Sequence, residues 1–313
     1  MADATRFGRR LCAAIALLAA VAPPCGAAIV AVDDAGHTLR LDRPATRIVT
    51  LAPSLTELVF AAGAGGAIVA TTVLSDYPAA ARAIPRIGDA SRLDIERLLA
   101  LKPDLVVVWR SGNTTREIDQ IEAAGLHVFR LEPRRLDDVP RAIERIGLLL
   151  GHEAGALEAA NVLRARLADL RRRFAMAAPV RVFYQVWSSP LMTINRDQIV
   201  NDVIELCGGR NVFAGLAPLV PQVSTEAVLA ADPEAIFSAD EHGGTETLRR
   251  NVDSASFATW RRYPSLAATQ GRWMYTLNGD MISRQGPRIA DGAAAMCRAL
   301  DQVRQERHRL PAR

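Results

Sequence analysis

The signatures of the common enzyme and metal-binding classes are missing from this chain of 313 residues. It has no Walker loop, no G-x-G-x-x-G and no G-x-S-x-G, so the phosphate-binding, dinucleotide-binding and serine-hydrolase classes lack their motifs. Cys-x-x-Cys and His-x-x-x-His spacings are absent too, and the five histidines lie far apart, at His37, His127, His152, His242 and His308. We therefore expect no metal site, no resident cofactor, no catalytic residues and no enzymatic activity.

A large excess of charge of either sign is also lacking. The formal net charge of the whole chain is +4. The first 28 residues hold three arginines and one aspartate, a net of +2, which leaves +2 for the remainder. A charge so near zero gives no electrostatic case for nucleic acid as a partner.

No apolar run reaches the ~20 residues that a membrane-spanning helix needs. The run at residues 11–21 follows three arginines and precedes a segment of small residues that ends at Ala28. This three-part layout predicts a secretory signal over residues 1–28, cleaved near Ala28. A membrane anchor is the alternative reading, but the run is too short for it. Lipid attachment at Cys25 is disfavoured because two prolines occupy the positions where small residues are expected.

Cysteines are few, and removal of the signal would take Cys12 and Cys25 with it. The remaining pair, Cys207 and Cys297, suggests a disulfide in an exported protein. Such a bridge would stabilise the fold by ~4 kcal/mol in the chain-entropy model. Two buried free thiols are the alternative.

What the chain does contain is a repeated alternation of strand and helix patterns. Residues 105–109 form an apolar run without polar alternation, which is typical of a strand buried on both faces of a parallel sheet. Ser54 and Glu57 have the spacing of a capping box and predict a helix that begins at Ser54. The alternation predicts a mainly parallel sheet with flanking helices.

A long helix is predicted over residues 153–174, where apolar residues recur every three or four positions. At ~1.5 Å per residue it would be long enough to bridge two lobes. After Pro179 the strand and helix alternation restarts, with a strand expected over residues 181–187. The fold class is therefore α/β, with two Rossmann-like lobes whose central sheets are mainly parallel, joined by one long interdomain helix. We expect a signal at 1–28, an N-terminal lobe at 29–152, a bridging helix at 153–175 and a C-terminal lobe at 176–313.

The restart is a weak internal repeat, since residues 94–106 align with residues 224–236. In each copy a glutamate, Glu96 or Glu226, lies in the first turn of a capped helix, where the helix dipole favours a carboxylate. Either residue alone could be a helix-start acid and nothing more. Their matched positions predict a paired contact with an external partner on one face of the molecule.

Candidate ligand residues lie at the strand ends, where open α/β sheets bind ligands. Trp109 ends a buried strand, Tyr77 lies in a turn, and Trp187 ends the first strand of the second lobe. The loop after the last strand contains Asp280, Met281, Ile282, Ser283 and Arg284. Together these residues predict an amphipathic cleft for a large, flat ligand with amide edges.

Several motifs resemble the periplasmic cobalamin-binding proteins of ABC importers. The resemblance runs from about residue 47 to residue 303, and it is strongest at residues 74–78, 94–104, 109–113, 207–213, 221–224 and 287–289. It implies two lobes around a rigid helix, with the ligand held between them. It also implies a periplasmic location, a corrinoid ligand, a monomer, and a permease dimer at the inner membrane as partner.

The resemblance also assigns roles to residues. The glutamates that dock on the permease match Glu96 and Glu226, and the disulfide of the family falls on Cys207 and Cys297. Its ligand contacts match Trp109 and the loop from Asp280 to Arg284. Three aromatic positions of the family hold Leu74, Ala90 and Val220 here, and Leu74 is retained as a candidate contact.

Other ligands and classes stay open at this point. Haem-binding relatives place a tyrosine near residues 88–90, and none is present here. A ferric siderophore needs arginines, which Arg110 and Arg284 could supply. An exported enzyme that uses the same cleft and a structural or adhesive protein are the two other classes.

Overall fold

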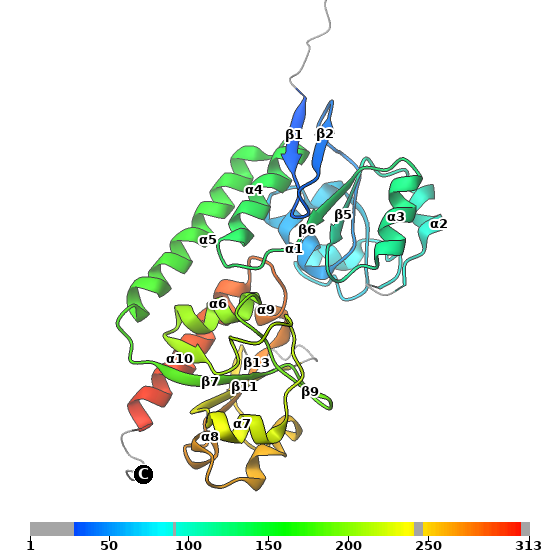
Figure 1. The fold of residues 1–313 in the computed structure, drawn as a ribbon. Coiled ribbons are helices and arrows are strands. Elements are labelled where there is room, and N and C mark those ends of the chain that lie inside the picture. Colours follow the sequence, from blue (N-terminus) through cyan, green and yellow to red (C-terminus); the bar gives the residue numbers. More distant parts are fainter. Residues whose placement is uncertain (1–27, 90–91, 241–246, 308–313) are drawn as a thin grey trace, which may run out of the picture.

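The computed structural model describes residues 28–89, 92–240 and 247–307. Apart from Ala28, the signal expected over residues 1–28 lies outside these ranges, and so does Ala90. In the described part of the chain, no helix combines the length and the apolar character needed to cross a bilayer. Figure 1 shows two α/β lobes with a long helix along one side.

A four-stranded parallel sheet with the order β4-β3-β5-β6 forms the centre of the N-terminal lobe. Its strands are β3 (Ile48–Thr50), β4 (Ile68–Thr71), β5 (Leu105–Trp109) and β6 (Val128–Leu131). The strand predicted over residues 105–109 is confirmed, and its first four side chains are buried. They alternate between two apolar clusters, so both faces of the sheet are covered.

Helices cover both faces of this sheet. α1 and α4 pack on one face, and α2 and α3 pack on the other. The remaining elements of the lobe are the hairpin of β1 and β2, which contacts α4 through β1, and two short 3₁₀ helices. Their bounds are α1 (Pro53–Ala61), α2 (Ile95–Ala100), α3 (Thr115–Ala123), α4 (Asp138–Leu150), β1 (Ile29–Val32), β2 (Thr38–Leu41), η1 (Gly65–Ala67) and η2 (Ala79–Ala83).

The start of α1 differs from the prediction. Pro53 occupies the first turn and Ala52 the N-cap position, so Ser54 and Glu57 lie inside the helix. The capping box is therefore wrong, because proline is well suited to the first helical position and starts the helix earlier. Glu57 is buried and forms ion pairs with arginines of the other lobe.

α5 (Glu153–Phe174) has 22 residues and confirms the helix predicted over 153–174. Its buried positions include Leu163, Leu167 and Leu170, which recur every three or four residues along one stripe. The helix contacts α4 in the N-terminal lobe and α6 and α10 in the C-terminal lobe. It therefore connects the two lobes along their common side (Figure 1).

The sheet of the C-terminal lobe has the order β10-β7-β11-β13-β12, and every pair is parallel except β12 with β13. This confirms the mainly parallel sheet expected for the second lobe. Its strands are β7 (Val180–Gln185), β10 (Gly209–Asn211), β11 (Ala235–Asp240), β12 (Leu248–Arg250) and β13 (Met274–Asn278). Because β7 ends at Gln185, Trp187 lies beyond the strand, in a short hairpin of β8 (Trp187–Ser188) and β9 (Leu191–Met192).

Helices cover both faces of this sheet as well. α6 and α10 pack on the face of Tyr184, and α7 and α8 pack on the face of Phe183. The helices are α6 (Ile199–Leu206), α7 (Thr225–Ala231), α8 (Ala267–Gln270), α9 (Gly279–Ile282), α10 (Ile289–Arg307), η3 (Ala255–Phe257) and η4 (Trp260–Arg262).

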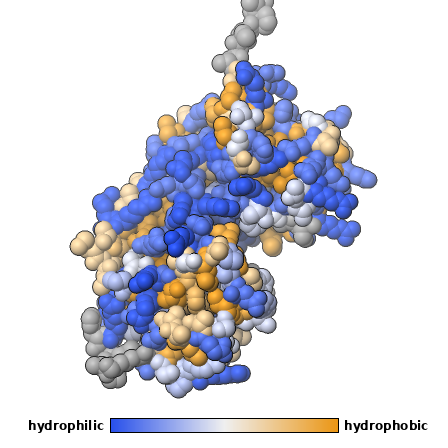
Figure 2. All heavy atoms as spheres, in the orientation of Figure 1, coloured by the Kyte–Doolittle hydropathy of each residue, from blue (hydrophilic) through white to orange (hydrophobic). Residues whose placement is uncertain are grey.

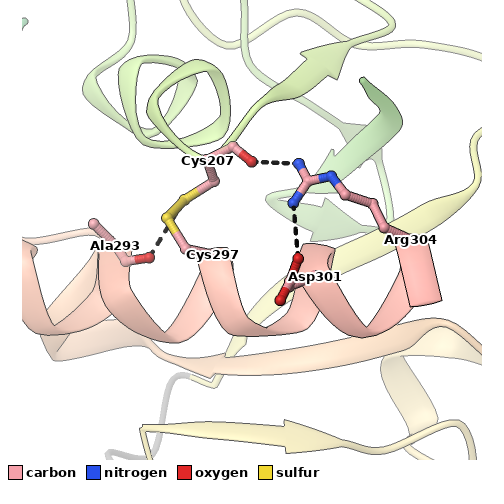
Figure 3. Close-up of a disulfide and its surroundings, with 5 residues drawn as sticks. All are labelled: Cys207, Ala293, Cys297, Asp301 and Arg304. Carbon is pink, nitrogen blue, oxygen red and sulfur yellow. Dashed lines mark hydrogen bonds and ion pairs between the residues drawn. A yellow bond between two sulfur atoms is a disulfide. The ribbon is translucent and has the colours of Figure 1, made fainter. Parts of the chain in front are cut away.

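A disulfide between Cys207 and Cys297 joins the end of α6 to the middle of α10 (Figure 3). The two Cα atoms are 4.6 Å apart and both residues are buried, so the expected bridge is confirmed. Arg304 lies one to two turns further along α10 and donates a hydrogen bond of 2.5 Å from Nη2 to the carbonyl oxygen of Cys207. The bridge and this hydrogen bond attach α10 to the end of α6.

Candidate functional site

A cavity of about 500 Å³ lies between the two lobes. It opens at the C-terminal ends of β5 and β6 in one lobe and of β7 and β11 in the other, where parallel sheets bind their ligands. Figure 2 shows hydrophobic residues gathered on the lower lobe near its junction with the upper lobe, whose face is mostly hydrophilic. The lining residues are Trp109, Ser111, Glu132, Pro133, Arg134, Tyr184, Val186, Trp187, Ile194, Asp197, Gln198, Ile199, Val200, Leu219, Val220, Ala239, Ser283 and Gln285.

Trp109 supplies the wall on the N-terminal side. Its amide donates to Asn113 Oδ1 at 2.7 Å, and Asn113 Nδ2 donates to the carbonyl oxygen of Leu51 at 3.1 Å. A Cβ atom on Gly112 would come within 1.8 Å of the indole ring, so only glycine permits this placement of Trp109. The indole Nε1 is buried and has no hydrogen-bond partner among the described residues.

Tyr184 supplies a second polar atom, from the C-terminal side. Burial raises the pKa of Tyr184 to about 12, and the neighbouring Ser283 hydroxyl opposes that rise. The phenol is therefore neutral and remains a donor at physiological pH. Its oxygen is buried and forms no well-shaped hydrogen bond within the described chain. Each lobe thus contributes to the cavity lining one residue with a buried donor that has no partner in the described chain.

The structure brings three of the nine predicted ligand residues to this cavity. Trp109, Trp187 and Ser283 line it. Met281 and Asp280 are half-buried outside its lining, and Ile282 is fully buried in the apolar core. Leu74 and Tyr77 are 72% and 45% exposed and lie outside the lining too. Arg284 is not in the lining either, so the cavity gives no evidence that these six residues contact a ligand.

Arg284 is held at the junction of the lobes instead. Its guanidinium pairs with Glu57 at 3.1 Å, with Asp76 at 3.1 Å and with Asp280 at 2.7 Å. Arg288 also binds Glu57, donating from Nε at 2.9 Å and from Nη2 at 2.6 Å. The Glu57 carboxylate, on a residue only 2% exposed, therefore receives two arginines of the other lobe.

Several cavity residues were missed by the sequence prediction. Tyr184 follows Val182 and Phe183 in β7, so the sequence indicates a core position. Glu132 and Arg134 follow β6 directly, and the rule that selected Trp109 at the end of β5 would have selected them. Glu132 is buried and accepts a hydrogen bond from the amide of Ser111 at 2.8 Å, which ties the two strand ends together.

The two glutamates predicted to dock on a partner are both exposed. Glu96 and Glu226 are the second residues of α2 and α7, which belong to different lobes (Figure 1). Asp94 and Ser224 cap these helices by accepting from the amides three residues later. A hydrogen bond from its own amide, and another from Ser224, hold the pKa of Glu226 below its ordinary value.

Comparison with known proteins places this geometry in a family. The family model described as "Periplasmic binding protein" matches residues 48–280. Vitamin B12-binding proteins of Vibrio cholerae and Yersinia pestis are each 35% identical, over 81% and 83% of this chain respectively and 88% of their own length.

Solved structures agree with that match. The crystal structure of the periplasmic vitamin B12 binding protein of Vibrio cholerae has a TM-score of 0.75 and 34% identity, covering 83% of this chain and 98% of its own. The periplasmic heme-binding protein RhuT from Roseiflexus sp. RS-1 has a TM-score of 0.70 and 25% identity, covering 82% and 98%. The chain therefore belongs to the periplasmic binding protein family.

Proposed function

We propose that this protein captures a cobalamin or a related corrinoid between its lobes in the periplasm and delivers it to the permease of an ABC importer, without catalysis. The observation that carries the proposal is the interlobe cavity, which offers apolar walls and one unsatisfied donor from each lobe within the described residues. A corrinoid is a flat macrocycle with amides around its edge. Its faces would pack on the apolar walls, and its amide oxygens would accept from Tyr184 and Trp109.

The similarity to vitamin B12-binding proteins over most of the chain supports the same ligand. Haem is the second candidate, because a heme-binding protein is among the similar structures. A ferric siderophore is less favoured. Arg284, one of the two arginines that could bind it, already forms three ion pairs at the lobe junction.

Tyr184→Phe tests the role of the cavity donors. We expect this change to weaken cyanocobalamin binding about fivefold, because it removes one hydrogen bond that the ligand would complete. Equilibrium titration followed by tryptophan fluorescence measures the affinity. Tyr275→Phe is the matched control, since its hydroxyl is also buried without a partner in the described structure, but outside the cavity. Equal affinities for Tyr184→Phe and the wild type would contradict this contact.

The delivery step is tested at Glu96 and Glu226. Replacing both by alanine should leave ligand affinity unchanged and lower thermal stability only slightly, because both side chains are exposed in the first turns of their helices. Association of the loaded protein with its permease in nanodiscs should weaken about tenfold or more, most strongly at low salt. The charge-matched control replaces the exposed Glu153 and Glu158 of α5. If the control weakens docking as much as the test variant, the docking role is wrong.

A further inference from the structure

A second cavity, of about 350 Å³, lies at the C-terminal ends of β7, β11 and β13 in the C-terminal lobe. Unlike the interlobe cavity, it is lined mainly by polar side chains. The lining residues are Gln185, Val186, Trp187, Ser188, Ser238, Ala239, Asp240, Asn251, Ser254, Ser256 and Thr276. Neither the delivery step nor the interlobe cavity accounts for this concentration of hydroxyl and amide groups.

Three of these groups form a row across the sheet. Ser238 is in register with Gln185 on one side and with Thr276 on the other, so the three side chains point to the same face. Tyr184, which lines the interlobe cavity, points to the opposite face. The two cavities therefore lie on opposite faces of one sheet, at the same edge.

Gln185, at one end of the row, is fixed by two hydrogen bonds. Gln185 Oε1 accepts from the indole of Trp260 at 2.7 Å, and its Nε2 donates to the carbonyl oxygen of Ser256 at 2.8 Å. All three residues of the row are buried. The Gln185 amide is therefore held in a defined geometry before any ligand arrives.

Thr276 gives the strongest indication of a ligand. The residue is only 6% exposed, and its Oγ1 has no hydrogen-bond partner in the ranges that the structure describes. A buried hydroxyl without a partner destabilises a fold, and a valine of the same shape would avoid the penalty. A ligand that binds in this cavity would supply the missing partner.

The charges around the cavity define the kind of group that it accepts. None of its described lining residues is a lysine, arginine or histidine, and its one carboxylate, Asp240, pairs with Arg249 at 2.6 Å. An anionic group would meet no cation among these described lining residues. A neutral group that both donates and accepts hydrogen bonds, such as an amide or a set of hydroxyls, fits it better.

The polar cavity adjoins the interlobe cavity, because Val186, Trp187 and Ala239 line both. Trp187 is half exposed at this boundary. We infer that the polar cavity is a subsite for a neutral, hydrogen-bonding arm, an amide arm in the case of a corrinoid, of the ligand whose body occupies the interlobe cavity. The ligand then straddles the edge of the sheet. This inference rests on the proposed function for the identity of the ligand.

Thr276→Val tests the subsite with two readouts of opposite sign. The melting temperature should rise by about 2–4 °C, because an unsatisfied buried hydroxyl is removed. Affinity for cyanocobalamin should fall about fivefold, because the arm loses a hydrogen bond. Thr72→Val is the matched control. Its Oγ1 is also buried without a partner within the described chain, yet it lines neither cavity. It should raise the melting temperature without changing the affinity.

The outcomes separate the subsite from the proposed function. A wild-type protein that does not bind cyanocobalamin would contradict the proposed function. Wild-type binding with unchanged affinity in Thr276→Val would overturn only the subsite.

Propionamide distinguishes an arm of the ligand from a free solute with the same chemistry. It should shift the amide resonances of Asn251 and Thr276 in the ligand-free protein, and lose that effect when cyanocobalamin is bound. Shifts that persist with the vitamin bound would overturn the inference and assign the cavity to a separate solute.

Discussion

Replacing both Cys207 and Cys297 by alanine should lower the free energy of unfolding by about 4–5 kcal/mol. The bridge spans a sequence separation of 90 residues, so its loss restores much of the conformational freedom of the unfolded chain. Both cysteines are buried between α6 and α10, so the change also leaves small voids in the core. Guanidinium denaturation followed by circular dichroism measures the loss.

Reduction provides the control for this experiment. Dithiothreitol should lower the stability of the wild type by a similar amount and leave the double variant unchanged. A double variant with the denaturation midpoint of the oxidised wild type would contradict a stabilising bridge.

The second large effect is expected at Glu57. Glu57→Ala should lower the free energy of unfolding by about 3–5 kcal/mol, because it leaves Arg284 and Arg288 partly buried without their shared carboxylate. The arginines belong to the other lobe, so the variant should also loosen the junction around the interlobe cavity. Thermal or chemical denaturation gives the stability, and hydrogen exchange reports opening at α1 and α10.

An exposed ion pair serves as the comparison for Glu57. Arg171→Ala removes the pair between α5 and Asp137, in which both side chains are about half exposed. We expect it to change stability by less than about 1 kcal/mol, as is usual for surface pairs. If Glu57→Ala changes stability as little as Arg171→Ala does, the ion pairs of Glu57 with Arg284 and Arg288 do not hold the lobes together.

The sequence was most informative where short-range pattern decides structure. α5 has the bounds expected from its apolar spacing, since its buried leucines follow one helical stripe. The predicted start of α1 is wrong. The sequence contains both a capping motif at Ser54 and a proline at Pro53, and the helix begins at the proline. Glu57 could not have been assigned from the sequence, because its arginine partners lie more than 200 residues further along the chain.

In the candidate site, too, some residues could be predicted from local sequence pattern and others could not. Trp109 could be selected because it ends a strand of a parallel sheet, where ligands bind. Trp187 lines the cavity as well, although it lies in the hairpin beyond β7 and not at the strand end. Tyr184 could not be selected, since a tyrosine that follows Val182 and Phe183 inside a strand indicates packing. Only the structure shows that its hydroxyl lacks a partner in the described chain and that the residue lines the interlobe cavity. Arg284 is predicted as a ligand contact, and its ion pairs with the distant Glu57 and Asp76 at the lobe junction could not be inferred from the sequence.

Calorimetric titration of the purified mature protein with cyanocobalamin tests the central claim most directly. Haem and a ferric siderophore are titrated under the same conditions. We predict tight one-to-one binding of cyanocobalamin and no comparable binding of the other two. Absence of heat with cyanocobalamin, together with saturable binding of haem or the ferric chelate, would contradict the account.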